Sequence, residues 1–176
     1  HETLTVIWNH RWEYDKGPEL LKAVVDLVES QSLDIEFIIA GLSFRNVPPA
    51  LQQLQEKHPR CIAHIGTYAQ KSEYQLALDN SQVVLSTAHH EFQGLAMLEA
   101  AARGCIPLAP DRLAYPEWVP KACLYKNGSM DKQAANIVAK LKHWQQHGLP
   151  TPVPVERYFW PSLIGQYLKE FNDLLD

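Results

Sequence analysis

The sequence predicts an α/β fold, in which a Rossmann-like parallel β-sheet of about six strands is sandwiched by helices. Short, continuously apolar segments such as residues 35–40 alternate with longer amphipathic segments such as residues 18–29 along the chain. Strands that are apolar on both faces are typical of parallel sheets, because crossover helices cover both faces. The chain has 176 residues, which is enough for one domain with a substantial core.

The first half of the chain supplies three strands and three helices. Apolar runs predict strands at residues 3–8, 35–40 and 61–65, and a glycine follows each of the last two runs. Apolar residues at helical spacing predict a helix at residues 18–29, which opens with Pro18. Two prolines precede a second expected helix at residues 50–57, and a third is expected at residues 71–79.

The second half continues the alternation. Strands are expected at residues 82–86, 106–109 and 122–125, with a short helical turn at 116–119. Good helix formers closed by Gly104 predict a helix at 95–103, and a long helix is expected at 131–147. Four prolines between Gly148 and a final helix at 162–175 indicate a stiff, exposed connector. We therefore divide the chain into a sheet domain at residues 1–150 and a Pro-rich connector with a C-terminal helix at 151–176.

Composition narrows the class of protein. The net charge of −4 argues against a strongly basic nucleic-acid surface within this chain. No apolar run reaches membrane-spanning length and no signal peptide is visible, so we expect no membrane association. Three widely spaced cysteines among apolar neighbours indicate reduced core thiols in a cytoplasmic protein. The chain does not begin with Met and enters a strand almost at once, so we expect it to be the C-terminal part of a longer polypeptide.

The loop and helix start at residues 86–99 form the strongest candidate site. They follow the apolar run at 83–85, and the helix opens near Gly94. Free backbone N–H groups and the dipole at a helix start favour a phosphate, and Gly94 leaves room for its approach. Glu91 and Glu99 flank this point, and their carboxylates could hold the hydroxyls of a sugar and a ribose. The alternative is that Glu91 only complements the helix dipole and Glu99 lies on a solvated face.

A second candidate site is the loop at residues 9–17, which follows the first strand. Arg11 and Lys16 lie five residues apart and could clamp a diphosphate and offset leaving-group charge. In the alternative reading both cations pair with Glu13 and Asp15 on a solvated loop. Ligands in parallel sheets bind at the carboxyl ends of strands, which is where both candidate sites lie. The chain contains neither GxxxxGK[ST] nor GxGxxG after the first strand, which argues against P-loop ATPases and nicotinamide dehydrogenases.

These residues resemble the C-terminal, donor-binding half of retaining glycosyltransferases of the GT-B fold, family 4 (group 1). The family pattern G-R-x4-K-G corresponds to residues 10–17, with His10 in place of the first glycine. The pattern E-G-F-G-L-x-x-x-E corresponds to residues 91–99, with two departures in the loop. More narrowly, the W-N-H-R-W-E run at residues 8–13 is similar to the tRNA-queuosine alpha-mannosyltransferase family.

The resemblance implies that residues 1–150 hold a nucleotide-sugar, which is expected to be GDP-mannose. It assigns Arg11 and Lys16 to the diphosphate, with help from the amides at Gly94–Leu95. Glu91 is assigned to sugar hydroxyls, so the implied catalytic residues are Glu91, Arg11 and Lys16. The resemblance further assigns Glu99 to the ribose and places Gly66, with Ile65 and Tyr68 nearby, beside the base. His90, which adjoins Glu91, is a candidate contact of the donor sugar.

The remaining expectations concern the reaction and its partners. The resemblance implies that no metal or other cofactor is needed, and the chain contains no D-x-D element. A missing N-terminal domain is expected to bind the tRNA acceptor, so this fragment alone is expected to be inactive. His10 either approaches the phosphates or caps a strand end, and His90 either touches the sugar or is ordinary loop polarity. The alternative functions are a UDP-sugar transferase acting on lipid or polysaccharide, and a non-catalytic nucleotide-binding module.

Overall fold

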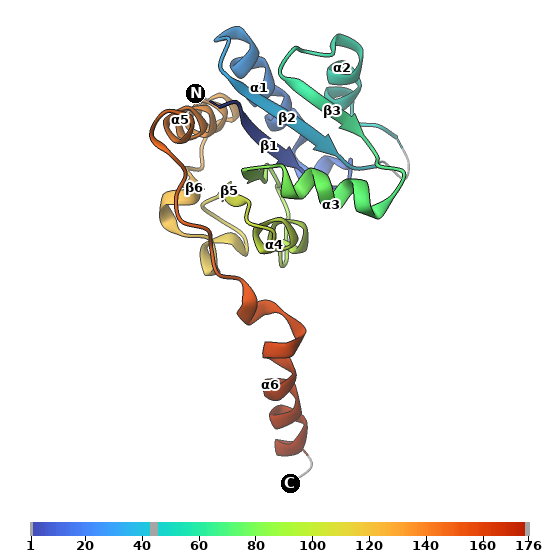
Figure 1. The fold of residues 1–176 in the computed structure, drawn as a ribbon, viewed down its shortest axis with the longest axis vertical. Helices are drawn as coiled ribbons and strands as arrows, with labels where there is room; N and C mark the ends of the chain where they lie inside the picture. The colour runs from blue at the N-terminus through green and yellow to red at the C-terminus, as the bar shows by residue number, and fades with distance from the viewer. Residues whose placement is uncertain (1, 43–45, 175–176) are drawn as a thin grey trace.

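Six parallel strands form the centre of the computed structural model, which describes residues 2–42 and 46–174 (Figure 1). Their spatial order is β3-β2-β1-β4-β5-β6. The strands are β1 (Leu4–Trp8), β2 (Ile35–Ala40), β3 (Ile62–Gly66), β4 (Val83–Leu85), β5 (Ile106–Pro110) and β6 (Leu124–Tyr125). The predicted α/β fold with a six-stranded parallel sheet is therefore confirmed.

The strand order places a topological switch at the middle of the sheet. The chain runs outward from β1 through β2 to β3, and then returns to pair β4 with the other edge of β1. Val6 faces Val83 in this central pair. Consequently, the segments that follow β1 and β4 leave the same end of the sheet as neighbours, and this crevice is where ligands bind in open α/β sheets.

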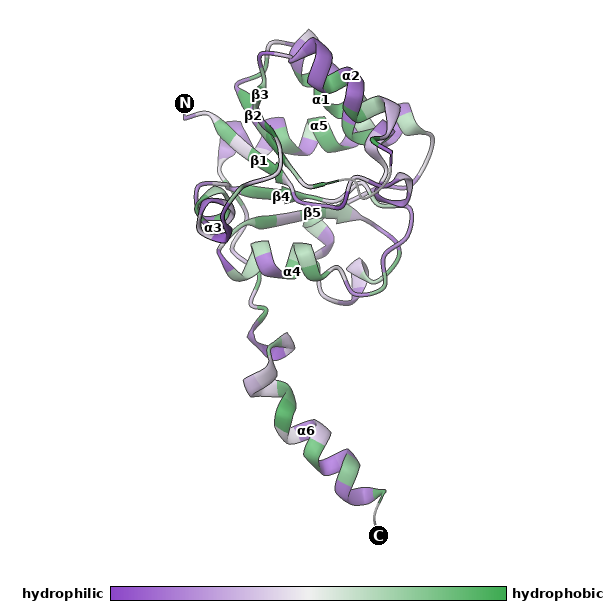
Figure 2. Ribbon diagram, turned by 90° about the vertical axis from the view of Figure 1, so that its right-hand side faces the viewer, coloured by the Kyte–Doolittle hydropathy of each residue, from purple (hydrophilic) through white to green (hydrophobic). Residues whose placement is uncertain are grey.

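Helices cover both faces of the sheet (Figure 2). One face carries α1 (Pro18–Ser30), α2 (Pro49–Lys57) and α5 (Met130–His147), and the other carries α3 (Lys71–Asp79) and α4 (Leu95–Ala102). Helix α1 directs Val24, Val25 and Val28 inward, where all three are fully buried. Burial on both faces explains why the central strands are continuously apolar, as the sequence indicated.

Two expected elements near the last strand differ in detail. The strand expected at 122–125 is reduced to Leu124–Tyr125, because Lys121–Cys123 form a 3₁₀ turn closed by the Cys123 N–H on the Pro120 carbonyl at 2.7 Å. The helical turn expected at 116–119 lies one residue earlier, at Tyr115–Glu117. Proline at the second position of that turn supplies the φ angle that a helical turn needs.

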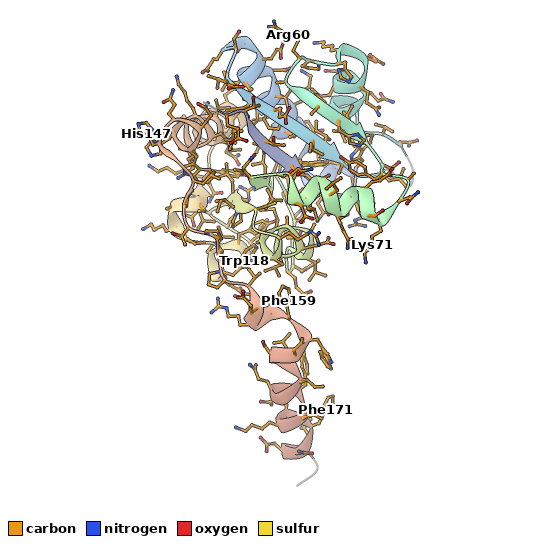
Figure 3. All side chains as sticks on the ribbon, viewed as in Figure 1. Arg60, Lys71, Trp118, His147, Phe159 and Phe171 are labelled. Carbon is orange, nitrogen blue, oxygen red and sulfur yellow. The ribbon has the colours of Figure 1, made fainter. Side chains whose placement is uncertain are left out.

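The connector after α5 is only partly exposed, so the prediction of an exposed connector is wrong at one point. Val155 has 2% of its surface exposed and belongs to the core, and Val153 packs against the same core. Beyond a further 3₁₀ turn at Glu156–Tyr158, helix α6 (Trp160–Asp173) extends away from the sheet domain (Figures 1 and 3). It begins two residues before the predicted start, and the predicted last residue, Leu175, lies outside the described residues.

Helix α6 keeps an apolar face in solvent. None of its residues is buried, and the exposed large side chains are Trp160, Ile164, Tyr167, Leu168 and Phe171. Figure 2 shows these hydrophobic segments alternating with polar ones along the helix. The expected core thiols Cys61, Cys105 and Cys123 are all buried and free. Within residues 2–42 and 46–174, no helix has the length and hydropathy that crossing a bilayer requires.

Candidate active site at the carboxyl ends of β1 and β4

The loop after β1 and the loop after β4 are held together by backbone contacts. The His89 N–H donates to the Asp15 carbonyl at 2.7 Å, and the Thr87 hydroxyl donates to the Lys16 carbonyl at 2.8 Å. A Cβ on Gly17, whose φ is +66°, would lie 2.0 Å from the Thr87 carbonyl oxygen. A glycine at this position therefore allows the two loops to approach each other and supplies the left-handed backbone.

Lys16 and Glu91 form the central ion pair of this site. Their side chains are 10% and 17% exposed, and Lys16 Nζ lies 3.1 Å from Glu91 Oε2. The same ammonium donates to the His90 carbonyl at 3.1 Å and lies 3.4 Å from the Asp15 carboxylate. The predicted alternative, in which Lys16 pairs with Asp15, is thus present together with the contact to Glu91.

The charge on Glu91 is stabilised by its neighbours. Burial raises the pKa of this carboxyl, but hydrogen bonds from Lys16 and from the Gly94 N–H outweigh burial, so the net pKa lies below its ordinary value. The Phe92 N–H also donates to Glu91, at 3.1 Å. Glu91 is therefore a carboxylate at neutral pH that faces both the cation and the start of α4.

A cavity of about 260 Å³ joins these groups to the start of α4. Arg11, Lys16 and Glu91 line it together with Leu95 and Ala96, the first two residues of the helix. Arg11 is 58% exposed and its guanidinium lies 3.5 Å from Glu13, as the predicted alternative has it. The two cations and the helix start nevertheless face one shared space, which is the arrangement that binds a phosphate or diphosphate.

Gly94 also has a structural role that does not depend on a ligand. Its φ is +72°, and a Cβ there would lie 3.0 Å from Cε1 of the buried Tyr115 ring. The Tyr115 hydroxyl shares a hydrogen bond with Ser86 at 2.7 Å, which holds the ring in place. Backbone conformation and this protein contact therefore favour glycine at position 94 in addition to the predicted space for a ligand.

A second cavity of about 330 Å³ adjoins the first, because Asn9, His10 and Arg11 line both. Thr67 and Tyr68, which follow β3, close its far side. The Tyr68 ring stacks on His64 with centroids 4.2 Å apart. Gly66 ends β3 next to these residues but does not itself line the cavity.

Glu99 lines neither cavity, but it is connected to the second one through Tyr74. Its side chain is on the exposed face of α4, and it accepts a hydrogen bond from the Tyr74 hydroxyl at 3.3 Å. Asn9 Nδ2 in turn donates to the Tyr74 oxygen and to the Ala96 carbonyl, each at 2.9 Å. Tyr74 lines the cavity, so this chain of hydrogen bonds fixes Glu99 relative to the end of β1.

The other predicted side chains contribute less directly to the two cavities. His90 contributes its backbone carbonyl to Lys16 while its own residue is exposed, and it does not line either cavity. Leu95 is exposed at the helix start, where its backbone lines the same cavity as Arg11. Within the described part of the chain, no group of three or more His, Cys, Asp or Glu side chains is arranged to hold a metal ion.

Comparison with known proteins identifies the family. The family model described as "Glycosyl transferases group 1" matches residues 3–143, which is most of the chain. The chain belongs to this family. It is 35% identical to the Drosophila melanogaster tRNA-queuosine alpha-mannosyltransferase over 170 residues, which are 95% of this chain and 45% of that protein.

More distant relatives share the same family or fold. A GDP-mannose:cellobiosyl-diphosphopolyprenol alpha-mannosyltransferase of Xanthomonas oryzae pv. oryzae is 21% identical, with 97% of this chain and 47% of that protein covered. Among solved structures, TarM of S. aureus, crystallised with UDP, has a TM-score of 0.72 at 22% identity, with 97% of this chain and 36% of that chain covered. The pneumococcal O-GlcNAc transferase GtfA, with UDP and GlcNAc, has a TM-score of 0.71 at 17% identity, with coverages of 99% and 35%. The chain therefore spans less than half the length of the curated relatives, and the structural likeness shows the fold.

Two residues of this group 1 site were not predicted from the sequence. Asn9 and Tyr74 line the larger cavity together with Tyr68, and these two position Glu99. Asn9 carried a usable signal, because it is the first polar residue after a buried strand. Tyr74 carried none, since aromatic residues are as common in packing roles as in binding sites.

Proposed function

We propose that this chain is the donor-binding half of a retaining glycosyltransferase that transfers a hexose, mannose from GDP-mannose, to queuosine in tRNA. The observation that carries the proposal is the cavity shared by Arg11, Lys16, Glu91 and the start of α4. Membership of the group 1 family and 35% identity to a tRNA-queuosine alpha-mannosyltransferase support the reaction type and the acceptor.

The proposed roles follow from charge. Arg11 and Lys16 hold the diphosphate and offset the negative charge that grows on it as the bond to the sugar breaks. Backbone N–H groups at Leu95 and Ala96 add the positive end of the helix dipole. Glu91 accepts hydrogen bonds from sugar hydroxyls, and Lys16 keeps it ionised for this purpose. Two cations and a helix start offset the leaving charge, so we propose that no metal is needed.

The nucleoside is proposed to occupy the larger cavity. Glu99 accepts hydrogen bonds from the ribose hydroxyls, and the base lies near Gly66, against the Tyr68 side of the cavity. His90 lines neither cavity, but its carbonyl contacts Lys16, and we propose that its imidazole contacts the donor sugar. The acceptor tRNA is proposed to bind a separate N-terminal domain, so residues 1–176 alone are expected to bind donor without transferring it. We propose a cytoplasmic location, which the three free, buried cysteines favour.

A UDP-sugar transferase acting on a lipid or polysaccharide is the second candidate function. It is favoured by the solved structures of the same fold that hold UDP, which include TarM and GtfA. A non-catalytic nucleotide-binding module is less well supported, because such a module could lose any of Arg11, Lys16, Glu91 and Glu99 without penalty.

Calorimetric titration of GDP, UDP, ADP and GDP-mannose into the purified protein separates these functions. We expect GDP and GDP-mannose to bind at least tenfold more tightly than UDP and ADP. Preference for UDP would replace the queuosine proposal with the UDP-sugar alternative. Absence of binding by all four ligands would contradict a donor-binding role for this chain and leave only a module without a nucleotide site.

A further inference from the structure

Two buried hydrogen-bond acceptors at the end of β1 have no partner among the described residues. They are Asn9 Oδ1 and His10 Nε2, and both residues line both cavities. A buried polar atom without a partner destabilises a fold by about 1–3 kcal/mol, so proteins retain few of them. Such an atom beside a ligand cavity indicates that a bound molecule supplies the missing hydrogen bond.

The surroundings of His10 determine which ring nitrogen carries the proton. The residue is 4% exposed, and its ring lies edge-on to Trp8 with centroids 5.1 Å apart. The ring forms a hydrogen bond with the Leu85 backbone. Since Nε2 has no partner, the nitrogen that makes this bond is Nδ1. Nδ1 therefore carries the proton that it donates to the Leu85 carbonyl, and Nε2 keeps a lone pair.

His10 stays neutral at physiological pH. Burial, followed by the positive charge of Lys16, lowers its pKa to about 4, against smaller opposing effects of Glu91, the Leu85 backbone and Asp15. A neutral imidazole of this tautomer offers Nε2 only as an acceptor. The oxygens of an ionised diphosphate are also acceptors, so they have no hydrogen to share with it, whereas a hydroxyl group does.

We propose that His10 is a specificity-determining residue whose Nε2 accepts a hydrogen bond from one hydroxyl of the transferred sugar and makes no bond to the diphosphate. This inference rests on the proposed function. The sugar is favoured over the ribose because Glu91, the proposed ligand of the sugar hydroxyls, acts on His10, whereas the proposed ribose ligand Glu99 is bonded to Tyr74. His10 thus has a ligand role of its own at the position where the family pattern has glycine.

The test measures binding of GDP, GDP-mannose and GDP-mannose analogues that each lack one sugar hydroxyl. In the unmodified protein, we expect one analogue to bind about tenfold more weakly than GDP-mannose, because His10 loses its donor. In His10→Phe, the affinity for GDP-mannose should fall by a similar factor, and that analogue should bind no more weakly than GDP-mannose. Affinity for GDP should change by less than about twofold, a difference too small to represent a lost hydrogen bond.

The matched control is Trp12→Phe. Trp12 Nε1 is likewise buried without a partner in the described chain, and the residue lines neither cavity. In Trp12→Phe, each analogue should lose as much affinity relative to GDP-mannose as it does in the unmodified protein. A second measurement needs no substitution: nitrogen NMR of labelled histidine should show an unprotonated Nε2 in His10 at pH 7.

Several results would overturn the assignment. Equal losses of GDP and GDP-mannose affinity in His10→Phe would make His10 a phosphate contact. If the analogue that lacks one hydroxyl still bound more weakly than GDP-mannose in this variant, that hydroxyl would not bond to His10, and the partner of His10 would be a buried water. A protonated Nε2 would also overturn it. Failure of the unmodified protein to bind any nucleotide-sugar would overturn the proposed function as well. If the unmodified protein binds GDP-mannose and the analogue still binds more weakly than GDP-mannose in His10→Phe, only the role of His10 is overturned.

Discussion

Lys16 Nζ lies 3.1 Å from Glu91 Oε2, although 75 residues separate the two in the chain. The contact exists because β1 and β4 are neighbours in a sheet whose strand order reverses between them. It joins the loop that supplies the cations to the loop that opens α4. The candidate site therefore depends on one central strand pair, which is itself fixed by apolar packing on both faces.

Replacing Glu91 with Gln should lower the free energy of unfolding by about 1–2 kcal/mol at pH 7, because a charge-assisted hydrogen bond is lost while Lys16 keeps Asp15 and the His90 carbonyl. The folded-state pKa of Glu91 is depressed, so its contribution is present above the unfolded pKa and is lost as pH falls through the folded pKa. Denaturant unfolding at a series of pH values should show the two proteins converging in acid. Glu13→Gln, which touches the exposed Arg11, should change stability by less than about 0.5 kcal/mol.

Replacing Arg11 with Ala should weaken GDP binding at least tenfold and leave guanosine binding nearly unchanged, because Arg11 lines the cavity that we propose holds the diphosphate. Isothermal titration with both ligands measures the difference. Arg60→Ala is the control, since Arg60 pairs with Glu29 and lines neither cavity of the site. Equal losses of GDP and guanosine affinity would remove Arg11 from the diphosphate site.

The sequence was sufficient for the strands and the two site loops, but not for the way the loops are supported. Apolar runs at 35–40 and 83–85 are local signals, and the carboxyl-end rule then places the residues that follow them. The hydrogen-bond chain from Asn9 through Tyr74 to Glu99 joins three elements that are distant in the sequence. No local pattern encodes such a chain, because it depends on how α3 and α4 pack.

The outward direction of α6 was also beyond the sequence. Its apolar face predicts that the helix packs on something, but a periodic pattern does not name the surface. The buried Val155 shows the same limit, since the prolines around it predict an extended segment and say nothing about one apolar side chain reaching the core. Gly94 was recognised for its position, but its contact with the Tyr115 ring was not predicted, because that ring comes from a later loop.

Tyr74→Phe should weaken GDP binding about three- to tenfold, because Glu99 loses the hydroxyl that positions it and a buried Asn9 donor loses an acceptor. Glu99→Ala should weaken nucleotide binding by about 1–3 kcal/mol through lost charge-assisted hydrogen bonds to the ribose. If Tyr74 acts only through Glu99, the double variant should bind no more weakly than Glu99→Ala alone. Fully additive losses would mean that Tyr74 acts separately, and unchanged affinity in Glu99→Ala would remove Glu99 from the ribose site.

The neutral His10 should make the fold acid-sensitive. Its pKa is lowered from 6.5 to about 4, so the unfolded chain binds more protons between these values and stability falls as pH falls through this window. The full pKa shift corresponds to a change of about 3 kcal/mol in the free energy of unfolding. Lys16, Glu91 and Asp15 are the charged groups that act on the ring, and His10→Phe retains all three. The unfolding free energy of this variant should therefore depend less on pH between 6.5 and 4, and an unaltered pH dependence would contradict a buried neutral ring.

Gly17→Ala tests whether close approach of the two loops is required. The new Cβ would meet the Thr87 carbonyl oxygen at 2.0 Å, and the residue must also keep a φ of +66°. Gly104→Ala is the matched control, because Gly104 has a φ of +97° and nothing within 4 Å of its Cβ position. Backbone strain of about 1–2 kcal/mol is common to both variants.

Only the first variant has to separate the loop that carries Lys16 from the loop that carries Glu91. We therefore expect Gly17→Ala to be destabilised by at least about 2 kcal/mol more than Gly104→Ala, as overpacking against backbone typically is. Thermal unfolding measures this difference, and GDP titration measures its effect on the site. Similar stability and similar GDP affinity in the two variants would mean that the loops tolerate separation, and the ion pair between Lys16 and Glu91 would then not define the donor cavity.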